Sequence, residues 1–346
     1  MLPYLLVLGF VMFWIALENK ALNRKSFFLP LVALSLFAAI RSYRVGTDSG
    51  TYTRHFRSNL NIYNFEFEKG VELGYQILEY ILLRLEANYS WLFLITAIIV
   101  VYCYLTIIKK YSVNYIFSIF LFITLGVYTF FFNGLRQGLG MAIFVLATPY
   151  LLERRFIPYL VICICASFFH TSALFMLPFY FLANLRIKPL YKVLATFLGS
   201  LVVSRFLINY IATTNVRYES YTEVSEEAGG LLTLGFYTIL LLFIYFIIRL
   251  YRIRDEYTIK LFTFYAMGVV FIIPVAMLGT MASGPQRLIT YFTWTLILIL
   301  PVMFRKINNI YITSLAVVLF LAYFVFTTTR FSNLTPYIIN PAFRIL

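Results

Sequence analysis

Long runs of apolar residues, separated by short polar stretches, constrain the fold of this chain more than any other feature. Hydrophobic residues make up 62% of its 346 residues and charged residues only 12%, against roughly 25% charged residues in an ordinary soluble domain. A soluble fold of this size could not bury so much apolar surface, so the runs are predicted to cross a lipid bilayer as helices. Aromatic residues reach 20%, which is typical of wide interfacial belts.

Twelve segments are candidate transmembrane helices, and the whole chain, 1–346, is predicted to be one all-α polytopic membrane domain. They are 2–17, 27–42, 91–108, 115–133, 137–152, 157–169, 172–184, 190–211, 231–248, 261–279, 288–304 and 310–328. The sixth and seventh are short and flank His170, so they are either two short spans or re-entrant pieces. The first lacks a positive n-region and a cleavage motif, so we expect a retained span rather than a signal peptide.

The segment 71–86 is periodic but too polar to be a span. Leucine and isoleucine fall on one helical face, and Glu72, Glu79 and Glu86 recur every seven residues on another. This pattern predicts an amphipathic helix that lies along an interface or packs on the bundle. The helix belongs to a long loop, 43–90, and a second loop, 212–230, is acidic and ends in two glycines.

Lys and Arg are distributed unequally between the two sets of loops. If the first short loop is cytoplasmic, its side holds sixteen of the 28 Lys and Arg residues and four of the 14 acidic residues, a net charge of +12, and the other side holds +2. The positive-inside rule then places both termini and the loops 43–90 and 212–230 outside. Topology therefore explains the formal charge of +14, and no nucleic-acid partner is expected.

The cations on the outer side are eleven Arg and a single Lys, and several lie at or near the ends of spans. They are Arg41 and Arg44 at the second span, Arg136 at the start of the fifth, Arg205 within the eighth and Arg287 at the start of the eleventh. An Arg in hydrocarbon snorkels, is paired or is functional. Because guanidinium groups and helix N-termini both suit phosphate, we expect a shared anion site.

Two further polar residues lie level with this Arg set. His170, at the outer end of an apolar run, is either a hydrogen-bonded structural residue or a base or substrate-binding group. Asp48 follows Arg41 and Arg44 closely, and a structural salt bridge and a functional role are equally open for it. The other histidine, His55, is expected to be a surface residue of the outer loop.

No spacing typical of a metal or cofactor site is present. The chain has no Asp-x-Asp, no paired His and no Gly-rich phosphate loop, and its three Cys lie inside apolar runs. Phosphate chemistry would therefore depend on Arg, and we expect neither a metal nor a cofactor.

In these residues the chain resembles the EpsG/Wzy-type family of bacterial membrane polysaccharide polymerases. The matching pieces are Arg41-x-x-Arg44-Val-Gly-Thr-Asp48-x-x-x-Tyr52, Glu72-Leu-Gly-Tyr75, Asn133-Gly-Leu-Arg136-Gln137-Gly138, Phe169-His170-Thr-Ser172 and Arg287-x-x-x-Tyr291. They occur in order over roughly residues 35–295, and all fall on the predicted outer side. The order and the shared location make the combination more specific than any one motif.

The resemblance implies a bundle of the GT-C glycosyltransferase type in the bacterial inner membrane, with its active site facing the periplasm. Such proteins join oligosaccharide repeat units carried on undecaprenyl pyrophosphate and build O-antigen of lipopolysaccharide, capsule or exopolysaccharide. The expected partners are the lipid-linked oligosaccharide, membrane lipid and a chain-length regulator protein. The loops 43–90 and 212–230 would then be periplasmic.

The resemblance also suggests roles for individual residues in a metal-independent transfer. Arg136 and Arg287, assisted by Arg41 or Arg44, would bind the pyrophosphate. The base for the acceptor hydroxyl would be His170, with Asp48 second and Glu72 third. His170 could instead bind pyrophosphate as imidazolium. The expected sugar contacts are Tyr52, Tyr75, Gln137 and Tyr291.

Three other functions fit an outer polar cluster in a membrane bundle. An O-antigen ligase uses the same donor lipid but passes the glycan to lipid A core. A lipid-linked oligosaccharide flippase would place charges along a path through the bilayer. A polytopic acyltransferase could use an outer histidine as its base but would not need so many Arg residues.

Overall fold

All regular elements among the described residues are helices, as the apolar periodicity predicts. The computed structural model describes residues 1–346 except 59, 87, 215–228, 279–283 and 344–346. Most of the acidic loop predicted at 212–230, and the side chain of Arg205, therefore lie outside the described residues. The chain divides into two compact units.

The first unit comprises Met1–Pro149, Ile157–Leu174 and Asn308–Leu346. Its elements are α1 (Leu2–Leu22), α2 (Phe28–Ala39), α3 (Ser49–Tyr52), α4 (Arg54–Arg57), η1 (Ile62–Asn64), α5 (Leu73–Leu85), α6 (Ser90–Tyr111), α7 (Tyr115–Thr124), α8 (Phe130–Asn133), α9 (Leu135–Val145), α18 (Ile310–Arg330) and η5 (Pro341–Phe343). The elements α10 (Thr148–Leu152), α11 (Phe156–Ser167) and η2 (Thr171–Phe175) contain residues of both units.

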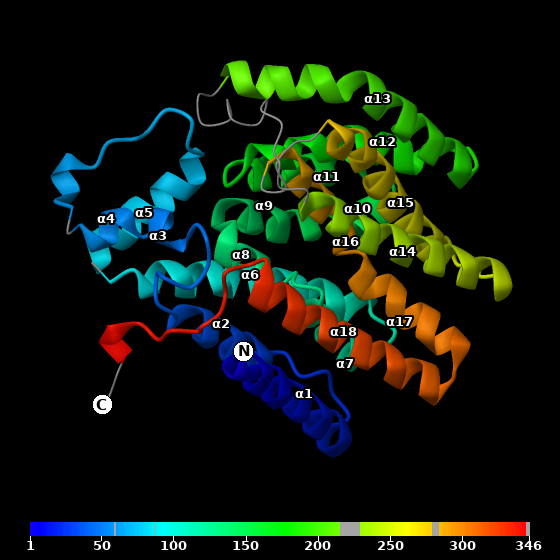
Figure 1. Ribbon diagram of the computed structural model, residues 1–346, viewed down its shortest axis with the longest axis horizontal. Coiled ribbons are helices and arrows are strands. Elements are labelled where there is room, and N and C mark those ends of the chain that lie inside the picture. The colour runs from blue at the N-terminus through cyan, green and yellow to red at the C-terminus, as the bar shows by residue number, and fades with distance from the viewer. Residues whose placement is uncertain (59, 87, 215–228, 279–283, 344–346) are drawn as a thin grey trace. The chain divides into compact units, whose positions relative to one another are not determined.

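Helix α6 forms the centre of the first unit. It packs against α2 and α9, while α1 packs against α2 and α7, and α18 against α7 (Figure 1). The end of the chain returns to the stretch that follows α2: Ser42 N–H donates to Ile338 O at 2.7 Å and Asn340 N–H to Ile40 O at 2.8 Å. The loop after α2 is thus held from both sides.

The second unit comprises Tyr150–Phe156 and Phe175–Ile307, and it is built around α15 (Glu256–Met277). Its other elements are α12 (Met176–Asn184), α13 (Pro189–Thr214), α14 (Gly229–Leu250), η4 (Pro285–Ile289), α16 (Thr290–Thr293) and α17 (Leu296–Ile307). All of them pack on α15. Gly268 of α15 allows this closeness, because a Cβ there would lie 2.1 Å from the Phe292 ring.

In the described part of the chain, five helices are long and apolar enough to cross a membrane. They are α1, α6, α14, α15 and α18, and the bent pair from Pro285 to Ile307 makes a sixth if it is one span. Each corresponds to one of the twelve predicted segments. Of the other predicted segments, 27–42 and 157–169 contain the 12-residue helices α2 and α11, and 190–211 falls within α13, which has 26 residues. The chain is a multi-pass membrane protein, and the count of twelve spans stays a prediction.

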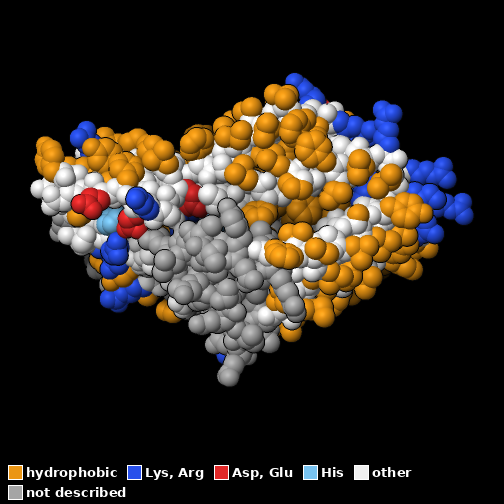
Figure 2. Space-filling model, turned by 90° about the horizontal axis from the view of Figure 1, so that it is seen from above, with side chains coloured by type: hydrophobic (Ala, Val, Ile, Leu, Met, Phe, Trp, Pro, Cys, Tyr) orange, Lys and Arg blue, Asp and Glu red, His pale blue; other side chains and the backbone are white. Residues whose placement is uncertain are grey.

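Helix α5 lies within the segment predicted to be amphipathic, and its faces are inverted relative to a soluble helix. Leu73, Ile77, Ile81 and Leu85 are 42–75% exposed, whereas Glu72, Gln76 and Glu79 are buried and only Glu86, which follows the last residue of the helix, is exposed. Figure 2 shows that hydrophobic side chains also cover much of the described surface on one side of the protein. An apolar stripe directed outward is the arrangement expected where lipid is the solvent.

Candidate functional site

A buried ion pair joins two motifs that are 64 residues apart in the chain. Arg136 Nη1 donates to Glu72 Oε2 at 2.5 Å, and the side chains are 15% and 6% exposed. Glu72 occupies the N-cap position of α5 but makes no capping hydrogen bond with its side chain. Arg136 lies in the first turn of α9, where unpaired backbone N–H groups create a partial positive charge. The carboxylate therefore fixes the guanidinium group beside a helix N-terminus.

The same carboxylate reaches the turn that carries His170. Thr171 N–H donates to Glu72 Oε1 at 3.3 Å, and Gly74 N–H donates to Phe168 O at 2.8 Å. Gly74 allows this close approach, since a Cβ there would lie 2.7 Å from the same oxygen. The start of α5 is thus docked on the turn after α11, and the predicted residues Glu72, Arg136 and His170 belong to one cluster.

The imidazole of His170 is held in one tautomer. Its Nδ1 lies 2.6 Å from Ser172 Oγ, and the backbone N–H of Ser172 donates to Nδ1 at 3.3 Å. A backbone N–H can only donate, so Nδ1 is the acceptor and the proton of the neutral ring is on Nε2. Whether His170 acts as a base or binds an anion stays a prediction.

Two of the predicted sugar contacts, Tyr52 and Tyr75, lie against each other. The Tyr75 hydroxyl donates to Tyr52 O at 3.4 Å, and the two rings are in edge-to-face contact at 5.9 Å. Tyr52 N–H donates in turn to the backbone carbonyl of Asp48 at 3.2 Å. Burial raises the pKa of the Tyr75 phenol well above its usual value. Gln137, next to Arg136 on α9, is also buried.

The loop that carries Asp48 is fixed by the end of α8. Thr47 N–H donates to Asn133 Oδ1 at 2.9 Å and Ser49 Oγ–H to Phe132 O at 2.9 Å. Gly46 has a φ of +101°, a conformation that side chains disfavour. A Cβ there would lie 2.6 Å from Asn133 Oδ1. The motif around Gly46 and the Asn133 motif therefore fold against each other.

The two arginines at the end of α2 have different surroundings. Arg41 is fully buried, donates to Ala38 O at 2.7 Å and lies 3.7 Å from the Phe93 ring and 4.0 Å from the Phe132 ring. Such cation–π contacts offset part of the cost of burying the charge. Arg44 is exposed and donates to Tyr43 Oη at 3.4 Å. Only Arg44 is open to solvent.

Arg287 and Tyr291 belong to the second unit. Arg287 is half-buried in the short 3₁₀ helix η4, and its carbonyl accepts from Thr290 Oγ1 at 2.5 Å. Tyr291, in α16, is fully buried. A common site for Arg136 and Arg287 therefore stays a prediction.

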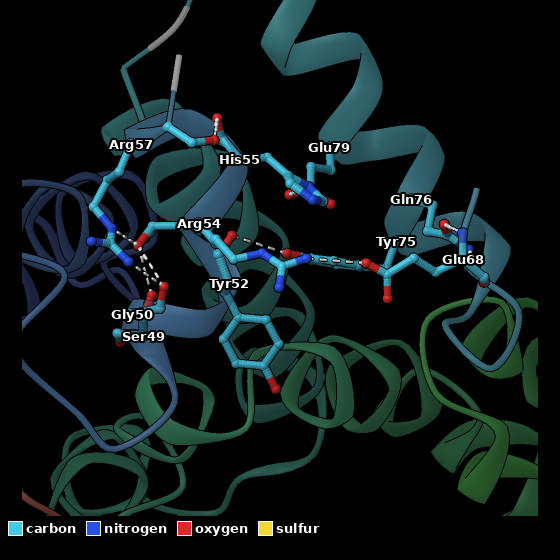
Figure 3. A network of polar contacts seen from close by, with 12 residues as sticks. Ser49, Gly50, Tyr52, Arg54, His55, Arg57, Glu68, Tyr75, Gln76 and Glu79 are labelled. Carbon is cyan, nitrogen blue, oxygen red and sulfur yellow. Dashed lines mark hydrogen bonds and ion pairs between the residues drawn. The ribbon is translucent and has the colours of Figure 1, made fainter. Parts of the chain in front are cut away.

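A second polar network on α5 differs from the prediction that His55 is a surface residue. His55 is only 22% exposed, and its Nδ1 lies 3.0 Å from Oε1 of Glu79, which is 7% exposed. Figure 3 shows the two side chains facing each other, with Arg54 and Glu68 beside them. The seven-residue spacing of Glu72 and Glu79 was the available signal, because it places both carboxylates on one face of the helix.

A family comparison covers the region that contains these motifs. The pattern of the EpsG family matches residues 24–339. The chain belongs to the EpsG family. The matched region includes every site residue that the sequence predicts, and the suspected relationship to EpsG/Wzy-type proteins is confirmed. No curated protein and no solved structure matches this EpsG-family chain.

In the described parts of both units, no three His, Cys, Asp or Glu side chains gather closely enough to hold a metal ion. Metal-independent catalysis stays a prediction.

Proposed function

We propose that this chain is a membrane polysaccharide polymerase. It joins oligosaccharide repeat units carried on undecaprenyl pyrophosphate at the periplasmic face of the bacterial inner membrane, within a GT-C-like bundle of about twelve spans. Membership of the EpsG family and the apolar helices support this proposal. The observation that carries it is the meeting of three family motifs, represented by Glu72, Arg136 and the His170 turn.

The reaction is the transfer of a glycan from lipid pyrophosphate to a sugar hydroxyl. Negative charge develops on the leaving pyrophosphate as the glycosidic bond breaks. Arg136, at the N-terminus of α9, stabilises this charge together with Arg287, and each such donor contributes about 3 kcal/mol in a water-poor site. Of the two assisting arginines, Arg44 is exposed and therefore better placed than the enclosed Arg41.

The other predicted residues have roles in the same transfer. His170, with its proton on Nε2, donates a hydrogen bond to a pyrophosphate oxygen. Glu72 fixes Arg136 and the His170 turn, and both of its carboxylate oxygens are engaged in these contacts. The sugar-binding residues are Tyr52, Tyr75, Gln137 and Tyr291. The lipid-linked oligosaccharide is the substrate, and a chain-length regulator protein is the expected partner.

The proposal is tested by comparing glycan length in membranes that contain single variants at normal protein level. Arg136→Ala, Arg287→Ala and His170→Ala are each expected to leave mostly single repeat units, while Arg330→Ala, a change at an exposed residue, leaves long polymer. Normal polymer from the first three variants would reject the mechanism. Normal chain length with loss of attachment to lipid A core would instead identify a ligase.

A further inference from the structure

The two histidines of the chain present opposite ring nitrogens. His170 accepts a backbone N–H at Nδ1 and so carries its proton on Nε2. His55 has its Nδ1 3.0 Å from a carboxylate oxygen of Glu79, which favours a proton on Nδ1 and leaves the lone pair on Nε2. A general base needs that lone pair.

Glu79 is suited to hold His55 in this state. It lies on the inward face of α5 with its side chain 7% exposed, and burial raises the pKa of the carboxyl group while His55 opposes that effect. A carboxylate at Nδ1 orients an imidazole and stabilises the imidazolium that forms when Nε2 takes up a proton. The Phe65 ring, 5.6 Å away and edge-to-face, supports the imidazole from another side.

The other charged groups around this pair are few. Arg54, the neighbour of His55 on α4, forms an ion pair with Glu68 at 3.3 Å. Both act on the Glu79 carboxyl, Arg54 lowering its pKa and Glu68 raising it. Because their charges are opposite, their effects on this carboxyl group oppose each other. Glu79, which contacts Nδ1, then determines which nitrogen of His55 holds the proton.

The two carboxylates that hold His55 and Arg136 lie two turns apart on α5. Glu72, which holds Arg136, and Glu79, which holds His55, are seven residues apart and therefore about 10 Å apart on one face of α5. Tyr75 lies between the two glutamates in the sequence, and its pKa is raised by burial and by the charge of Glu79 and lowered by that of Arg136. In glycosidases that work by single displacement, acid and base are roughly 6.5–9.5 Å apart, with the sugar between them.

Building on the proposed polymerase function, we propose that His55 is the general base for the acceptor hydroxyl and that Glu79 is its positioning residue. The hydroxyl proton passes to His55 Nε2 while its oxygen forms a bond to the anomeric carbon of the donor sugar. The bond from that carbon to the pyrophosphate oxygen breaks, and its electron pair leaves with the lipid pyrophosphate. Because base and leaving group lie on opposite sides of the sugar, the transfer inverts the anomeric carbon.

The experiment measures polymerisation of a synthetic lipid-linked repeat by the full chain in lipid nanodiscs. His55→Gln is expected to lower kcat about 10²–10⁴-fold with little change in KM for the donor. Added imidazole should restore part of the activity of His55→Gly. Undecaprenyl pyrophosphate should inhibit the Arg136→Ala variant less strongly than the wild-type chain. It should inhibit the His55→Gln variant as strongly as the wild type.

Glu79→Gln tests the positioning role separately. Without the carboxylate nothing holds the imidazole proton on Nδ1, so kcat should fall and its pH profile should change. Glu79→Asp should recover part of the loss. Glu66→Gln makes the same chemical change at an exposed position in the same loop and should leave rate and profile unchanged.

Other outcomes would overturn individual parts of the inference or of the proposed function. Full activity of His55→Gln beside an inactive Arg136→Ala would overturn the role of His55 and leave the polymerase proposal standing. Retention at the anomeric carbon would overturn the single displacement. If His55→Gln fails to fold, an unchanged profile for Glu79→Gln overturns the inference. A wild-type chain that forms no polymer would overturn the proposed function itself.

Discussion

The ion pair between Glu72 and Arg136 joins two motifs that are separate in the sequence. Each is costly to bury alone, and removal of one partner of a buried ion pair destabilises a protein by about 3–5 kcal/mol. We therefore expect Glu72→Gln to lower the free energy of unfolding by about 3 kcal/mol, measured by denaturation of the purified protein in detergent. The double variant Glu72→Gln/Arg136→Met should recover most of this loss. Additive losses would contradict a coupled pair.

The histidine tautomers can be observed directly. The chain has two His, so selective ¹⁵N labelling gives two sets of ring signals. At pH 8 we expect the His170 ring to carry its proton on Nε2, because Ser172 N–H occupies Nδ1, and the His55 ring to carry its proton on Nδ1, beside Glu79. Spectra of His55→Gln and His170→Gln assign the signals. The same tautomer at both sites would contradict the separate roles of donor and base.

At the scale of elements, α5 shows what the sequence could predict and what it could not. Its periodicity predicted the helix and separated an apolar face from an acidic one, but periodicity does not say which face is turned toward the protein. In a soluble protein the apolar face would be inside. Here Glu72 and Glu79 point inward because Arg136 and His55, far from them in sequence, supply partners. The Glu79–His55 pair was missed for that reason.

The docking of α5 depends on Gly74. A Cβ at this position would lie 2.7 Å from Phe168 O and 2.9 Å from its Cβ, so Gly74→Ala should displace α5 from the His170 turn. We expect at least a 10-fold loss of polymerisation and a lower unfolding temperature. Gly235→Ala is the matched control, since nothing lies within 4 Å of its added Cβ. Equal activity of the two variants would mean that the turn and α5 need not stay together.

The exposed stripe of α5 is expected to touch lipid. Ile81 is 48% exposed and shares a face with Ile77 and Leu85. A Trp placed there by Ile81→Trp, in a chain without its native Trp residues, should be quenched by brominated lipids in nanodiscs. Trp in place of the exposed Glu66 should be quenched far less. Equal quenching at both positions would remove α5 from the membrane interface.

At the scale of the whole molecule, sequence predicted the all-helical class and the helices long enough to cross a bilayer. Apolar runs such as 115–133 contain internal breaks that hydrophobicity alone does not mark. Gly126, with a φ of +76°, lies between α7 and α8, and the run from Pro285 to Ile307 bends by 46° between Thr293 and Leu296. Polar residues near such breaks are distant from one another in the sequence. The order of their motifs could be compared with a family, but their contacts could not be predicted.

The predicted orientation can be tested helix by helix, by asking whether a given helix crosses the bilayer. Helix α6 is the clearest case. It has 22 residues, about 33 Å of helix, enough for a hydrocarbon layer of about 30 Å. In a background lacking the exposed Cys165, Glu66→Cys should react with an impermeant maleimide added to intact spheroplasts, and Lys110→Cys only after lysis. Because α6 is the long helix between these positions, reaction of both from one side would show that it does not cross. Reversed labelling would place the Glu72–Arg136 cluster on the cytoplasmic side, away from a periplasmic donor.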